Sequence, residues 1–228
     1  MRGVFFSSMF LVAGLAAVAG FAAVNAVPRL EYTKFFKGSV PEYVSIAIEK
    51  SGQVTYKEAA DDERPIHFQI PQDQVDQFFA LAAKLDHFTR PLESPLKVAH
   101  MGIKTFRIQD GATKGEVKFN YSEDADAREL ADRFERITDT EQNFINLERA
   151  VKFDKLGVNQ ALLLVQMTYE KKRLIAPEQF LPLLDRVIKN ESYMHMSRER
   201  ASSLADLFRS PASIKTEAAK AENDKPEK

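Results

Sequence analysis

Apolar residues alternate with polar ones through the first half of the chain, from residue 27 to residue 121. An alternation with a period of two is typical of β-strands that bury one face. Residues 42–58 predict a hairpin, because Gly52 supplies a tight turn between two alternating runs. Further strands are predicted at 30–36, as an edge strand before the hairpin, and at 66–70.

After Pro71 the spacing of the apolar residues changes to a helical period. Residues at three- and four-residue intervals predict an amphipathic helix from Gln72 to Leu85, with its aromatic stripe packed on the sheet. The segment 90–95 contains two prolines, which interrupt any helix or strand. This segment is therefore interpreted as a connection.

A second hairpin is predicted by two alternating runs at 103–108 and 117–121. Asp110 and Gly111 form a turn dipeptide between them, although the spacing indicates a loop longer than two residues. A hairpin, a strand, a helix and a second hairpin favour a mainly antiparallel sheet with one face covered by a helix. The fold class expected for this half is α+β.

Helical spacing continues through the second half of the chain. A break and a new helix cap are predicted at residues 138–140, and Gly157 is expected to end the helix that follows. The run 161–165 is apolar on nearly all sides, so its helix is expected to be the most deeply buried. Two more helices are predicted, one that begins at Pro177 and one that covers roughly 192–209.

These patterns divide the chain into four segments. Residues 1–26 are predicted to be a signal peptide, and residues 27–138 an α+β sheet domain. Residues 139–209 are predicted to be a helical region that packs on this domain or forms a small bundle. Residues 210–228 contain too few apolar groups to offset the entropy of ordering, which predicts a disordered tail.

The first 26 residues have the pattern of an export signal. Arg2 precedes an uncharged run that ends in Val24-Asn25-Ala26, a sequence similar to an A-x-A cleavage site. Cleavage after Ala26 would leave a secreted or periplasmic protein without membrane attachment. The alternative is an uncleaved N-terminal anchor, because the run is long enough to span a bilayer.

Composition narrows the possible chemistry. The chain contains no cysteine, which excludes disulfides, thiolate nucleophiles and cysteine-based zinc sites. Its 32 Lys and Arg residues nearly balance 33 Asp and Glu residues without forming a basic stripe, so no nucleic-acid partner is expected. No glycine-rich phosphate loop or G-x-S-x-G motif occurs, so no nucleotide, cofactor or serine nucleophile is expected.

Two histidines, His87 and His100, flank the proline-rich connection, with Asp86 and Glu93 near them. If the fold brought these residues together, they would form a metal site or a pair of base and orienting group. No pair of histidines in the chain has the H-x-x-x-H spacing of zinc ligands. The favoured interpretation is that they are surface residues, so no catalytic, cofactor-binding or metal-binding residue is assigned.

The segment Gly38–Tyr43, with the sequence GSVPEY, resembles the start of a family of exported bacterial domains of unknown function that open with a Pro-x-Tyr hairpin. The likeness covers about residues 29–138 and includes a helix like Gln72–Leu85, with a phenylalanine like Phe88 after it. Family members often carry a cysteine near the position of Val40, where this chain has none. The resemblance implies no activity and no functional residue, because the family has no settled activity.

Three functions remain open. The absence of catalytic motifs favours a non-catalytic module of the cell envelope that binds an unknown protein or envelope component. One alternative is a hydrolase of an envelope polymer that uses two dispersed carboxylates, since such a pair need not be close in sequence. The other is a structural or assembly protein whose C-terminal helices pair between copies. The acidic clusters at 61–63 and 123–126 are interpreted as surface turns and helix starts.

Overall fold

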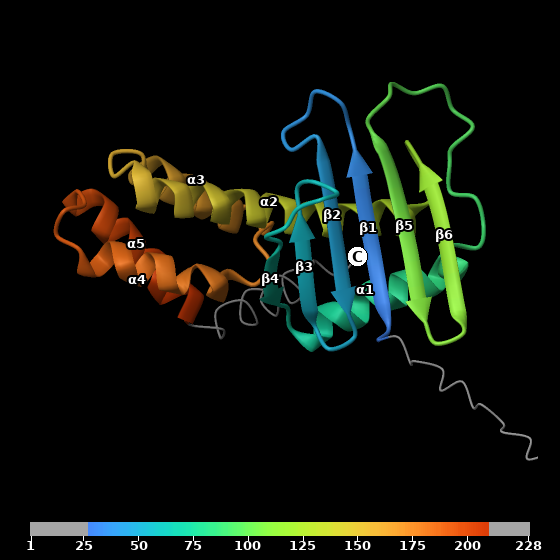
Figure 1. Ribbon diagram of the computed structural model, residues 1–228, viewed down its shortest axis with the longest axis horizontal. Helices are drawn as coiled ribbons and strands as arrows, with labels where there is room; N and C mark the ends of the chain where they lie inside the picture. Colours follow the sequence, from blue (N-terminus) through green and yellow to red (C-terminus); the bar gives the residue numbers. More distant parts are fainter. Residues whose placement is uncertain (1–26, 210–228) are drawn as a thin grey trace, which may run out of the picture.

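The structure is a computed structural model that describes residues 27–209. It confirms the predicted α+β class: a six-stranded antiparallel sheet is followed by helices. In Figure 1 the sheet lies at one end of an elongated molecule and the C-terminal helices lie at the other. The predicted signal peptide and the predicted disordered tail fall outside the described residues. No helix between residues 27 and 209 is long and apolar enough to cross a membrane.

The sheet has the strand order β4-β3-β2-β1-β5-β6, with every neighbouring pair antiparallel. Its strands are β1 (Arg29–Phe35), β2 (Tyr43–Glu49), β3 (Gln53–Lys57), β4 (Ile66–Gln69), β5 (Ile103–Asp110) and β6 (Thr113–Phe119). The prediction of an edge strand at 30–36 is wrong, because β1 pairs with β2 on one side and β5 on the other. The second hairpin loop is shorter than predicted, since Asp110 pairs with Thr113. Gly111 makes this tight turn with a φ of 59°.

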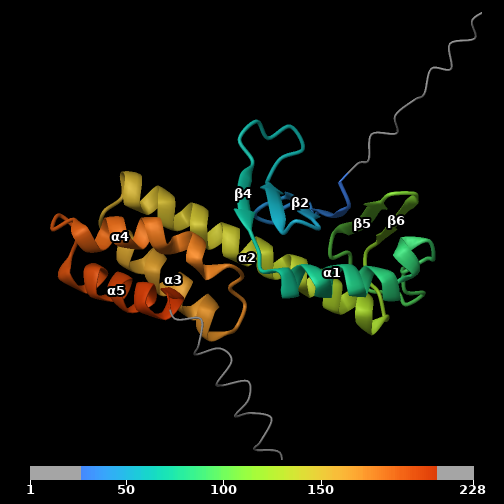
Figure 2. The same ribbon diagram turned by 90° about the horizontal axis from the view of Figure 1, so that it is seen from below.

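Five α-helices and two short 3₁₀ turns complete the described chain. They are α1 (Gln72–Lys84), η1 (Asp86–Phe88), α2 (Ala125–Phe153), α3 (Val158–Glu170), η2 (Pro177–Phe180), α4 (Leu181–Lys189) and α5 (His195–Arg209). Figure 2 shows α1 and the first half of α2 on the same face of the sheet. α1 buries Val75 and Phe78 there, as its spacing predicts. The opposite face of the sheet carries polar residues of the alternating patterns, among them Glu31, Thr33 and Arg107.

α2 is a single helix of 29 residues, so the predicted break at residues 138–140 is wrong. The hydroxyl of Thr140 donates a hydrogen bond to the main-chain oxygen of Arg136 at 2.8 Å, within the helix. It also accepts a hydrogen bond from the main-chain nitrogen of Ile175 at 3.0 Å. The threonine that suggested a helix cap is therefore a fully buried residue in the middle of a helix.

Two hydrophobic cores lie along α2. The first forms between the sheet, α1 and the N-terminal part of α2, where Phe134 and Ile137 are buried. The second forms between the C-terminal part of α2, α3, α4 and α5, and contains Leu147 and Phe180. One helix thus belongs to both cores, and residues 138 and 139, where the sequence pattern divides the two regions, lie inside it.

The C-terminal helices differ from prediction in their ends and burial. α2 ends at Phe153, and Gly157, which was expected to end a helix, is the residue before α3. α3 buries Leu162 and Val165, but Leu164 keeps 40% of its surface exposed. α3 therefore has an exposed side and buries four residues, one fewer than α5, so the expectation that it is the most deeply buried helix is wrong.

Candidate functional site

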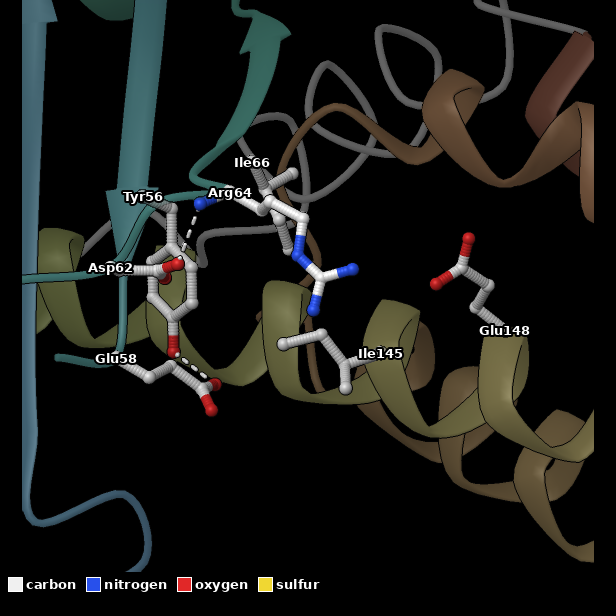
Figure 3. A pocket seen from close by; sticks show the side chains of 7 residues that line it. All are labelled: Tyr56, Glu58, Asp62, Arg64, Ile66, Ile145 and Glu148. Carbon is white, nitrogen blue, oxygen red and sulfur yellow. Dashed lines mark hydrogen bonds between the residues drawn. The ribbon is translucent and has the colours of Figure 1, made fainter.

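A pocket of about 410 Å³ lies where the β4 edge of the sheet meets the middle of α2. β3, the loop after it and β4 supply one wall, and α2 supplies the other (Figure 3). The lining residues are Tyr56, Glu58, Asp62, Arg64, Ile66, Ile145 and Glu148. The two hydrophobic cores meet at this place. Ligand sites often occur between two packed units, so the pocket is a candidate binding site.

The helical period of α2 explains how its residues reach the pocket. Phe134 and Ile137 are buried beneath the sheet. Glu141, Ile145 and Glu148 continue the same helix face at steps of three and four residues. This face therefore changes from apolar core to pocket wall as the helix leaves the sheet.

The carboxylate of Glu58 is held in place by two neighbours. The hydroxyl of Tyr56 donates to Glu58 Oε1 at 3.0 Å, and the side-chain amide of Gln142 donates to the same oxygen. Burial raises the pKa of Tyr56, and the carboxylates of Glu58 and Glu141 raise it further. Tyr56 is consequently a neutral hydrogen-bond donor that fixes Glu58 at the pocket wall.

Glu141 lies behind this wall and is fully buried. Among residues 27–209 neither of its carboxylate oxygens has a hydrogen-bond partner, and burial raises its pKa to about 7. The nearby amide of Gln179 lowers this pKa and the charge of Glu58 raises it, but Gln179 Nε2 faces the main-chain oxygen of Ile175 at 3.5 Å. The site thus combines one carboxylate at the pocket wall with a second, buried one behind it.

Arg64 is the one cationic side chain among the lining residues. Its main-chain nitrogen donates to Asp62 Oδ1 at 2.9 Å, which fixes the turn. Figure 3 shows its guanidinium over Ile145, facing the side of the pocket where Glu148 lies. Within the described residues Arg64 forms no ion pair. Three carboxylates and one guanidinium leave the lining with a formal charge of −2, since 1 − 3 = −2.

The fold does not bring His87 and His100 together. The main-chain oxygen of His87 lies against Gly115, near the start of β6. The ring of His100 packs edge-on against Phe36, with 6.1 Å between ring centroids, beyond the end of β1. These positions lie at opposite ends of the sheet, so the two histidines share no site.

The acids near these histidines are also engaged elsewhere. Asp86 forms an ion pair with Arg90 at 3.1 Å, and Glu93 accepts a hydrogen bond from the main-chain nitrogen of Asn120. Across residues 27–209 no group of three or more His, Asp or Glu side chains is arranged to hold a metal ion.

The acidic clusters have two different roles. Asp124 accepts hydrogen bonds from the main-chain nitrogens of Asp126 and Ala127, so it caps α2 as a helix-start acid does. Asp62 belongs to a turn, but it also lines the pocket, which its local sequence does not indicate.

Sequence reasoning missed Glu141 because it placed a helix break just before that residue. The available signal was its position four residues after Ile137, which extends the buried stripe of α2 if the helix continues.

No protein-family model matches this chain, and a search of curated proteins gives no match. The geometry and charge of the molecule itself are therefore the basis for assigning a function.

Proposed function

We propose that this protein is an exported, non-catalytic binding module of the cell envelope. The pocket between the β4 edge and the middle of α2, the junction pocket, binds a positively charged side chain of a partner protein in this proposal. The main support for this proposal is a set of carboxylates around an apolar floor. Glu58, Asp62 and Glu148 surround Ile66 and Ile145 in the pocket lining. A lysine or arginine packs its apolar stem on such a floor and places its charge among the acids.

The position of Arg64 supports this choice of ligand. Its side chain extends over the apolar floor as a bound cation from a partner would (Figure 3). Arg64 is exposed and without an ion pair among the described residues, so moving aside breaks no strong contact. A partner's cation would displace it and gain the three carboxylates.

A hydrolase is the less well supported alternative. Glu58 and Glu141 form a pair of carboxylates in different environments, which is the arrangement that acid catalysis of glycoside cleavage uses. A general acid must contact the atom that it protonates, either directly or through one water. Glu141 has no exposed surface, so it does not meet this requirement in the described structure.

Titration calorimetry with an oligolysine peptide tests the proposal. The protein is expected to bind oligolysine and to bind neither oligoglutamate nor fully acetylated oligolysine. Binding should weaken in the variants Glu58→Gln and Glu148→Gln, which each remove one charge from the lining.

Glu63→Gln is the matched control, since Glu63 is an exposed acid in the same loop that does not line the pocket. If Glu63→Gln weakened binding as much as Glu58→Gln did, the peptide would be responding to the overall charge and the proposed site would be wrong. Export is tested separately: the protein recovered from the envelope or medium should begin at Val27 when its N-terminus is read by mass spectrometry.

A further inference from the structure

Exposed apolar side chains gather at one end of the sheet, far from the junction pocket. We call this group the loop-end patch; it consists of Phe35, Leu96, Val98, Met101 and Ile103. Leu96 keeps 55% of its surface exposed, and Met101 keeps 54%. The patch combines the end of β1 with the connection that leads into β5, and Figure 1 shows the loop after β1 and this connection at the same end of the sheet. Exposed apolar residues that gather in this way mark interaction surfaces.

The two loops are held against each other where they leave the sheet. Phe35 pairs with Ile103 in the β1–β5 ladder. The ring of Phe36 packs against the ring of His100, and it also leaves room only for a glycine at Gly102. The two loops therefore form one surface.

The longer loop is also held by polar contacts that leave its apolar side chains outside. Asn120 accepts a hydrogen bond from the main-chain nitrogen of Met101 at 2.7 Å and donates one to the main-chain oxygen of Ala99 at 3.1 Å. Ser94 bonds the main-chain nitrogen of Leu96 at 3.1 Å. Every residue from 95 to 101 is nevertheless exposed. The apolar side chains are thus displayed by a braced loop, and they do not fold back onto the core.

Two lysines on these loops are without an ion-pair partner among the described residues. Lys37 and Lys97 are exposed and take part in no ion pair within the described residues, and Lys97 stands between two apolar residues of the patch. The acids on the same loops keep their negative charge, but each is held by a main-chain donor: Glu42 accepts from the nitrogen of Gly38, and Glu93 accepts from the nitrogen of Asn120.

From this combination we infer that the loop-end patch binds the surface of a bilayer that contains anionic lipids. Apolar side chains at the tips of projecting loops enter the boundary between headgroups and acyl chains, and neighbouring lysines contact the anionic headgroups. The complementary charge of Lys37 and Lys97 is what favours a lipid surface as the occupant. This attachment is independent of the junction pocket, and it goes beyond the unattached protein that the sequence pattern predicts.

A fluorescent label at the patch tests this inference. Because the full chain has no cysteine, Val98→Cys provides a single site for an environment-sensitive dye. Its emission should shift to the blue with vesicles of phosphatidylcholine and phosphatidylglycerol in equal parts, and should not shift with phosphatidylcholine alone. The same dye at Leu156→Cys, in the turn after α2, should stay in water with both kinds of vesicle, since Leu156 is more exposed than Val98 but this turn lies at the other end of the molecule.

Charge reversal separates the patch from other membrane contacts. Lys37→Glu and Lys97→Glu should each lower partitioning of the Val98 label by about fivefold or more, the factor that corresponds to losing one lysine near an anionic surface. Lys114→Glu, at the opposite end of the sheet, makes the same change of charge and should have little effect. If the label stays in water with both vesicle types, as it would if the patch served a protein partner, or if Lys114→Glu acts as strongly as Lys97→Glu, the inference is overturned.

Discussion

The hydroxyl of Thr140 accepts a hydrogen bond from the main-chain nitrogen of Ile175, with 3.0 Å between the two atoms. This contact joins the middle of α2 to the segment between α3 and η2. Ile175 and Ala176 pack in the core beneath the sheet, although they belong to the helical half of the chain. The bond therefore satisfies a buried main-chain group at the place where the two cores meet.

Replacing Thr140 with valine should destabilise the protein by about 1–3 kcal/mol, because the buried nitrogen of Ile175 would lose its partner. Thr138→Val is the matched control: the hydroxyl of Thr138 bonds only the oxygen of Phe134 in its own helix. Urea denaturation of both variants measures the difference. Equal losses in the two variants would show that the bond to Ile175 contributes nothing specific.

The stability of the protein should depend on the ionisation of Glu141. Its pKa is about 7 in the folded state and 4.5 as the reference value, so the folded state binds the proton more tightly. Protonation of Glu141 therefore adds to the free energy of unfolding. This contribution is fully present below pH 4.5, decreases as the pH rises toward 7, and is lost above pH 7. The difference amounts to about 3 kcal/mol.

Glu141→Gln removes this titration with little change of shape. The variant should gain stability relative to the natural protein as pH rises from about 5 to about 8, and denaturation curves across this range measure the gain. Glu129→Gln changes a partly exposed carboxylate on the same helix, one that pairs with Arg133 at the surface, and should show no such trend. A pH-independent difference between Glu141→Gln and the natural protein would contradict the buried, protonated state.

Gly115 provides the contact surface for the turn after α1. A Cβ atom at this position would collide with the main-chain oxygen of His87, and the turn that carries it, Asp86–Phe88, has positive φ at all three residues. Gly115→Ala should therefore cost about 3 kcal/mol, since the backbone has to move. Gly111→Ala, which meets open space but keeps a positive φ, should cost about 1 kcal/mol. Thermal denaturation compares the stability of the two variants. A smaller loss of stability in Gly115→Ala than in Gly111→Ala would show that the turn at Asp86–Phe88 moves at little energetic cost.

Removing the guanidinium of Arg64 should strengthen the binding of oligolysine to the junction pocket. Arg64→Ala changes the formal charge of the lining from −2 to −3 and clears the floor near Ile145. The affinity should also fall as salt is added, because the pocket is open to solvent and its charges are screened. Calorimetry at several salt concentrations checks both points. Weaker binding by Arg64→Ala would mean that Arg64 contacts the ligand and does not compete with it.

The order of residues alone predicts the elements that bury one face and expose the other. Alternation predicted both hairpins, and the three- and four-residue spacing after Pro71 predicted α1. Asp124 was correctly interpreted as an acid at a helix start, because capping involves only neighbouring residues. These features depend on local backbone geometry and on which side chains avoid water. Both are set by residues that are close together in the sequence.

Which strands are neighbours, and where α2 ends, depend on contacts between residues far apart in the chain. β1 is central because β5, more than sixty residues later, pairs with it, and no local pattern specifies that partner. Thr140 stays helical because Ile175 supplies its hydrogen bond, whereas its local sequence favours a cap. Once α2 continues, Glu141 falls on its buried face and the pocket acids come together from two distant segments. The candidate site therefore depends on contacts between residues far apart in the chain, which form only when the two cores pack along one helix.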